Sequence, residues 1–317
     1  LKCIFESNTL RSSAYIQVVC KFQKTEVIME TFGNKLNNLL KESKGLLFLQ
    51  GEMAQLTYLS FEKNVEWINQ LEEGATIPIA YPLGYRTDNT PIMSDPKNYT
   101  KDELTERYTF LGLNKLPIDS IFQLTTIMET LLNDVLKMIL IEYPNKIPSK
   151  KQVDINCVLN SSSIEQAKIF IVESILNEIA YKSPRDYATE FEKYTGVNLL
   201  ENPVFHKYIE LKSTRDIHIH NSGQANEIYT AKSGVLSRVK SGEYLPVDIQ
   251  YFLMSYEQCL QLNEVLEDEL DKIWPSENHR NKQQITHKAE KEEVVEHLLE
   301  EAKKELVEKA VTTKTEE

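Results

Sequence analysis

One short segment of the chain gathers side chains that suit acid–base chemistry on a phosphate ester. Arg215, Asp216, His218 and His220 all lie between positions 215 and 220. Histidine titrates near neutral pH, so it can take a proton from a reacting hydroxyl or return one. Arginine presents a permanently charged planar fork that fits phosphate oxygens. Such a combination suits metal-free phosphoryl transfer, for example the reaction in which a ribose 2′-hydroxyl of RNA attacks the adjacent phosphate.

Each residue of the segment can be given a role in this reaction. We expect His220 to act as general base or acid, Arg215 to stabilise the pentacovalent phosphorane, and Asp216 to orient either group. The expected product is a 2′,3′-cyclic phosphate end, and the reaction needs neither a metal nor a cofactor. For His218 we expect a supporting role or an RNA contact.

The spacing of Arg215 and His220 raises a geometric difficulty. At 100° per residue the two positions are about 140° apart on a straight helix. We expect the helix to fray or turn at His220 and Asn221, which would relieve the separation. A purely structural alternative remains open, in which Arg215 pairs with Asp216 or Glu210 and His220 caps the end of the helix.

The order of arginine, polar residue, short spacer and histidine resembles the signature of the HEPN superfamily of helical bundles. Residues 191–196 before the motif, and Asn221 and Tyr229 after it, are similar to the bacterial branch. The resemblance covers residues 116–274. It implies an RNA substrate contacted by His218, Asn221 and Tyr229.

The same resemblance has implications for assembly and biology. It implies a homodimer in which motifs from two protomers form one composite active site. It also implies a toxin or abortive-infection effector in anti-phage defence, with an antitoxin or another protein as a possible partner. Members of the family that have lost activity leave an alternative, namely a non-catalytic module that binds nucleotides or protein partners.

The elements around the motif are predicted to be helices. Residues 116–143 form a broad apolar face at helical spacing, which is typical of a central bundle helix. Ser163, Ser183 and Asn202 are expected N-caps, and Gly196 is an expected C-terminal stop. The helix after Asn202 carries the motif, and another covers residues 247–274.

The first part of the chain is harder to interpret. Residues 12–44 and 52–72 are expected to form two helices, and a strand over residues 14–22 is an alternative to the start of the first. Residues 74–100 contain four prolines and indicate a long ordered loop or a linker. Thr100 and Glu103 form an expected capping box.

Composition supports an all-α protein, because glycine and proline number only 10 and 11 among 317 residues. We expect an N-terminal, mostly helical region (1–110), a HEPN-like bundle (116–274), and a polar linker with an acidic amphipathic helix (276–317). A net charge of −12 argues against a protein that coats duplex DNA. The four cysteines lack metal-site spacing and are expected to be buried thiols. Without a bilayer-length apolar run or a secretory signal, a cytoplasmic location is expected.

Overall fold

The computed structural model describes residues 30–153 and 155–277. The acidic helix expected near the end of the chain and the strand considered for residues 14–22 lie outside these residues. The described elements, in chain order, are α2 (Phe32–Asn69), β1 (Thr76–Ile79), β2 (Pro82–Tyr85), β3 (Pro91–Met93), β4 (Lys97–Thr100), α3 (Lys101–Phe110), a π-helical turn (Leu111–Lys115), α4 (Leu116–Glu142), a 3₁₀ turn (Pro144–Lys146), α5 (Ile155–Leu159), α6 (Ile164–Ala180), α7 (Pro184–Thr195), a 3₁₀ turn (Leu199–Glu201), α8 (Pro203–His220), α9 (Glu227–Ser233), a 3₁₀ turn (Gly234–Leu236) and α10 (Ile249–Ile273).

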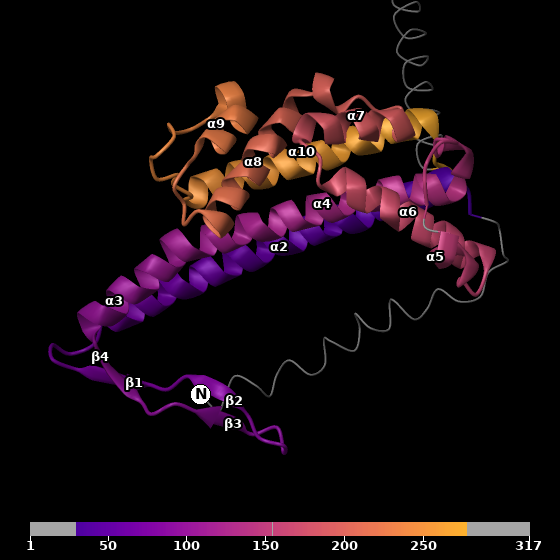
Figure 1. Cartoon of the computed structure of the whole chain (residues 1–317). Coiled ribbons are helices and arrows are strands. Elements are labelled where there is room, and N and C mark those ends of the chain that lie inside the picture. Colours follow the sequence, from indigo (N-terminus) through magenta and orange to yellow (C-terminus); the bar gives the residue numbers. More distant parts are fainter. Residues whose placement is uncertain (1–29, 154, 278–317) are drawn as a thin grey trace, which may run out of the picture.

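The protein is mainly α-helical, as predicted, and three long helices form its frame (Figure 1). The helices α2, α4 and α10 pack against one another, and α8 lies on α4 and α10. The central helix α4 buries apolar side chains along nearly its whole length, from Ile121 to Leu140. Its broad apolar face explains why helices can cover it from several sides. None of the helices in the described ranges has both the length and the apolar character that crossing a bilayer requires.

The predicted helix ends around the motif are confirmed. The side chains of Ser163, Ser183 and Asn202 each accept a backbone N–H from the first turn of α6, α7 and α8, respectively. Gly196 ends α7 with φ of 85°, a conformation that costs glycine least. These short-range signals fix where α8 begins, and therefore where the motif lies along it.

The helix α2 corrects the prediction of two helices in this region. It is a single helix of 38 residues that continues through Gly45 and Gly51. A Cβ at position 51 would lie 2.9 Å from the ring of Tyr256 on α10. Gly51 therefore permits close contact between two helices and does not break the first one.

Residues 74–100 also differ from the predicted loop or linker. The strands β1 and β4 pair antiparallel, and β2 and β3 pair antiparallel between them, which makes one long hairpin. This hairpin arm, residues 76–100, extends beyond the ends of α2 and α3, clear of the bundle (Figure 1). Its prolines are tolerated because both strands of a two-stranded ribbon are edge strands. Ile68, Tyr99 and Leu104 form a small buried cluster at its base.

The two predicted regions on either side of residue 110 are joined without a break. The π-helical turn carries α3 directly into α4. From α2, Leu40, Leu47 and Ala54 belong to the same buried core as residues of α4 and α10. The helix that carries the motif is thus supported by a core to which both parts of the chain contribute.

Candidate functional site

We expected α8 to fray or turn at His220 and Asn221, and it stays helical through His220 and turns at Asn221. The N–H groups of Asn221 and Gly223 both donate to the carbonyl of Ile217, and Gly223 has φ of 82°. These bonds close the helix just after the last residue of the motif. Within one chain, Arg215 and His220 therefore keep the separation of about 140° that a straight helix imposes.

Arg215 is held in a group of charges that joins α8 to α4 and α9. It donates to Asp216 over 2.9 Å and lies 3.7 Å from a carboxylate oxygen of Glu129. Lys212 reaches the other oxygen of Glu129 at 2.7 Å, and Lys232 lies 3.8 Å from Asp216. The Arg215 side chain is 24% exposed, so the guanidinium is constrained by carboxylates but remains open to solvent.

One of the two ion pairs considered for Arg215 in a purely structural role is present. Its pair with Asp216 is present, whereas Glu210 bonds Arg238 on the other side of the helix. A carboxylate next to the arginine is compatible with either an orienting or a purely structural role.

His220 and Asn221 lie apart from this charge group. His220 is exposed at the end of α8, and it is not among the residues that line the pocket around Arg215. The side-chain amide of Asn221 donates to the carbonyl of Gln224, which fastens the turn after the helix. The structure therefore brings Arg215 and Asp216 together but leaves His220 outside their pocket.

His218 has a structural partner on the loop that precedes α10. Its Nε2 lies 2.9 Å from the carbonyl oxygen of Leu245, and its ring meets that of Tyr244 edge to face. Burial lowers the pKa of His218, and the nearby cations Arg238 and Lys115 lower it further. The neutral ring can then donate Nε2–H to the carbonyl, which ties the end of α8 to the loop.

Tyr229 is buried and does not reach the surface. Its hydroxyl donates to the Glu210 carboxylate over 2.8 Å and accepts the backbone N–H of Arg238 over 3.1 Å. The hydroxyl thus both donates and accepts a hydrogen bond within the protein.

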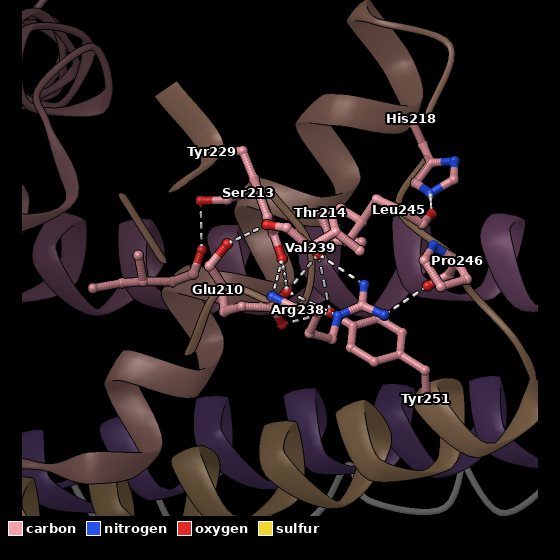
Figure 2. A network of polar contacts seen from close by, with 12 residues as sticks. Glu210, Ser213, Thr214, His218, Tyr229, Arg238, Val239, Leu245, Pro246 and Tyr251 are labelled. Atoms are coloured by element: carbon pink, nitrogen blue, oxygen red, sulfur yellow. Dashed lines mark hydrogen bonds and ion pairs between the residues drawn. The ribbon is translucent and has the colours of Figure 1, made fainter. Parts of the chain in front are cut away.

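Figure 2 shows the network to which Tyr229 belongs. Glu210 is its centre, and this carboxylate accepts hydrogen bonds from Thr214, Tyr229, Arg238 and Tyr251. Its side chain is only 8% exposed, so its charge needs these partners. The network fastens residues 237–247 to α8 and α10.

The sequence offered only a faint signal for this network. Glu210 stands between the apolar residues Ile209 and Leu211, but Lys207 and Lys212 lie close by, so the sequence hardly distinguishes it from a surface charge. Its cationic partner, Arg238, is 28 positions away and follows a loop. Pairing across such a distance cannot be inferred from local pattern.

Arg215 and Asp216 line a pocket of about 430 Å³, which we call the α8 pocket. This volume falls within the range of small-molecule sites in proteins. The lining residues are Glu129, Leu132, Asn133, Ala180, Tyr181, Lys182, Pro184, Tyr187, Phe205, Tyr208, Ile209, Lys212, Ser213, Arg215, Asp216 and Lys232.

Metal and thiol chemistry find little support in the described part of the chain. No group of histidine, cysteine, aspartate or glutamate residues within residues 30–153 and 155–277 has an arrangement that could hold a metal ion. Cys259 is a buried free thiol, as expected, and burial raises its pKa to about 12. A thiol that stays protonated is a poor nucleophile.

Comparison with known proteins gives no relative from which a role could be transferred. No protein-family model matches the chain, and no curated protein or solved structure matches it either. The HEPN resemblance therefore rests on the motif and its flanks, and the function has to be argued from the site.

Proposed function

We propose that this protein is a metal-independent endoribonuclease of the HEPN type, with a site completed by a second copy of the chain. The observation that supports the proposal is the position of Arg215, a partly exposed guanidinium at a cation-rich pocket, on the same helix as an exposed histidine. Arg215 would stabilise the phosphorane, Asp216 would orient the guanidinium, and His220 would transfer the proton.

The geometry of α8 supports the proposed homodimer. Arg215 and His220 face different directions within one protomer, and a second copy of the chain would bring one of each into a shared cleft. Two α8 helices related by a twofold axis would place His220 of one protomer opposite Arg215 of its partner. Each dimer would then have two equivalent sites.

The first experiment is a cleavage assay. Purified protein is incubated with total RNA in EDTA, and the ends of the products are analysed. Wild type is expected to leave 2′,3′-cyclic phosphate ends, and Arg215→Ala and His220→Ala are each expected to abolish cleavage. His206→Ala is the matched control, because His206 is an exposed histidine of α8 outside the motif.

A mixing experiment tests the composite site directly. Neither variant alone has an intact site, but a dimer with one Arg215→Ala and one His220→Ala protomer has one intact site out of two. Random pairing makes half of the dimers mixed, so about a quarter of wild-type activity is expected on symmetry grounds. Cleavage by wild type that persists in both variants, or no cleavage at all, would contradict the proposed nuclease.

A non-catalytic interaction module is the second candidate, and one feature of α2 favours it. Leu46, Leu49, Met53 and Leu56 are 50–60% exposed and follow the alternating three- and four-residue spacing of a coiled-coil seam. Such a stripe is typical of a surface that binds another protein. Loss of partner binding in Leu49→Glu, with binding intact in Arg215→Ala, would support this candidate.

A further inference from the structure

The α8 pocket has a buried floor and an accessible rim. Phe205 and Tyr208 of α8 are buried beneath it, whereas Tyr181 and Lys182 at the rim are exposed. Most of its walls come from α4, α7 and α8, and Ala180 at the end of α6, the loop before α7 and Lys232 of α9 complete the lining. The pocket is therefore built on rigid elements, as ligand sites commonly are.

Four buried polar atoms of this pocket lack a hydrogen-bond partner within the described part of the chain. They are Oδ1 of Asn133, Nε of Arg215, and the hydroxyl oxygens of Tyr187 and Tyr208. Buried polar atoms without partners cost stability, so native proteins keep few of them. Four such atoms around one cavity are consistent with a site that binds a polar molecule.

The two tyrosine hydroxyls are hydrogen-bond donors throughout the physiological pH range. Burial raises the pKa of both Tyr187 and Tyr208, so that each hydroxyl keeps its proton. The charge of Glu129, a residue that also lines the pocket, raises both values further. Hydrogen-bond donors and cations thus line the same pocket.

The charge balance of the lining is positive. Four basic residues line the pocket, against the two acidic residues Glu129 and Asp216. Lys182 is bonded to Glu190, outside the lining, over 2.5 Å. Lys212, Arg215 and Lys232 then share two carboxylates, and 3 − 2 leaves one positive charge unbalanced.

We propose that the α8 pocket binds a small phosphate ester. Arg215 and the hydroxyls of Tyr187 and Tyr208 would donate to the phosphate oxygens, because arginine forks and charge-assisted hydroxyl bonds suit this group. Asn133 Oδ1 would accept a hydrogen bond from a hydroxyl group close to the phosphate.

The surroundings of the pocket suggest where the body of the ligand lies. A second hollow of about 570 Å³ shares Pro184, Ile209 and Lys232 with the α8 pocket. Its lining includes the apolar side chains Ile228 and Val235. A phosphate held by Arg215 can therefore carry an apolar or aromatic body into the neighbouring hollow. This binding does not depend on RNA cleavage.

Calorimetric titration of the full chain tests the proposal with three simple probes. Phenyl phosphate is expected to bind, inorganic phosphate to bind more weakly, and phenol, which has the same ring without the anion, to show no binding. Failure of both phosphate probes to bind at millimolar concentration would overturn the proposal.

Hydroxyl-deletion variants separate a binding role from mere burial. Tyr187→Phe and Tyr208→Phe should each weaken phenyl phosphate binding about tenfold, the value of one hydrogen bond to a charged group. The thermal midpoint of the unliganded variants should stay the same or rise, because an unpartnered buried hydroxyl is removed. Tyr85→Phe, an exposed tyrosine of the hairpin arm, is the matched control and should change neither property.

The outcomes remain distinct from those of the nuclease assay. Weakened binding in both variants of a protein that does not cleave RNA would support the pocket and count against the nuclease. Unchanged binding in both variants, with raised stability, would show that these hydroxyls are buried by packing alone and would overturn the pocket proposal.

Discussion

The guanidinium of Arg238 lies against the ring of Tyr251, with 3.6 Å between its central carbon and the ring centroid. Both side chains also donate to the carboxylate of Glu210. The loop before α10 and the first turn of α10 therefore meet at one carboxylate on α8. The position of the motif helix depends on this junction.

Removing Arg238 should destabilise the protein strongly. Arg238→Ala leaves the charge of Glu210 buried without its cation, and such a loss costs about 3–5 kcal/mol. The free energy of unfolding in urea measures the effect. Arg185→Ala, at an exposed arginine of α7, is the control and should stay within about 0.5 kcal/mol of wild type. A loss of less than about 1 kcal/mol for Arg238→Ala would contradict a central role of the network.

His218 should make stability depend on pH. Its pKa is lowered in the folded protein, chiefly by burial, so the unfolded chain binds a proton more readily. The free energy of unfolding should therefore fall as the pH drops through the ordinary histidine value of 6.5 towards the lower folded value. Denaturation curves at pH 7.5, 6.5 and 5.5 (chosen about the ordinary histidine pKa) measure this decline. It should be shallower in His218→Asn than in wild type, and equal slopes in the two proteins would refute the assignment.

Two glycines of α2 should respond in opposite ways to alanine. A Cβ at Gly33 would lie 2.4 Å from the carbonyl oxygen of Trp274, and backbone atoms cannot yield cheaply, so a loss of about 1–3 kcal/mol is expected. A Cβ at Gly45 meets nothing within 4 Å, so the better helix propensity of alanine should add about 0.5–1 kcal/mol. Thermal and urea unfolding of both variants test this contrast, and a shared sign would contradict it.

Disruption of the hairpin arm should remain local. Tyr99 is buried against Ile68 and Leu104, whereas Tyr85 is 71% exposed. Tyr99→Ala should speed amide exchange in β1 and β4 at least tenfold, since about 1.4 kcal/mol of local stability corresponds to that factor. Amides of α4 should keep their wild-type protection, and Tyr85→Ala should leave both regions unchanged. Faster exchange in α4 would show that the arm and bundle unfold together.

The parts of the fold that depend on local chemistry could be predicted from the sequence. Ser163, Ser183 and Asn202 cap helices as expected, because each bond joins residues two or three positions apart. The broad apolar face of α4 is likewise a property of its own residues. Signals of this kind require no knowledge of the rest of the chain.

The predictions for α2 and for residues 74–100 were wrong because residues distant in the sequence determine the structure there. Gly51 would weaken an isolated helix, but its neighbour Tyr256 on α10 makes the glycine useful there. In the arm, the register of Ile77 opposite Tyr99 is set by pairing between two edge strands, which tolerate prolines that otherwise suggest a loop. Neither relationship is visible in a short window of sequence.

The candidate site likewise has a part that the sequence predicts and a part that it does not. The bond between Arg215 and Asp216 joins adjacent residues and could be anticipated. Glu129, Tyr187 and Tyr208 reach the α8 pocket from positions that the motif does not specify. The motif therefore identified one wall of the pocket, and the remaining walls required the packing of α4 and α7 to be known.

The buried cluster at the base of the hairpin arm is separate from the main core of the bundle, which affects how the sequence of this protein can evolve. Ile68, Tyr99 and Leu104 share no member with the main core, although α2 contributes to both. Insertions or deletions near the tip, where Asn89 adopts φ of 63°, would lengthen or shorten the ribbon without repacking the long helices. Packing in the main core thus constrains substitutions in the long helices, whereas the length of the hairpin arm can change without disturbing that packing.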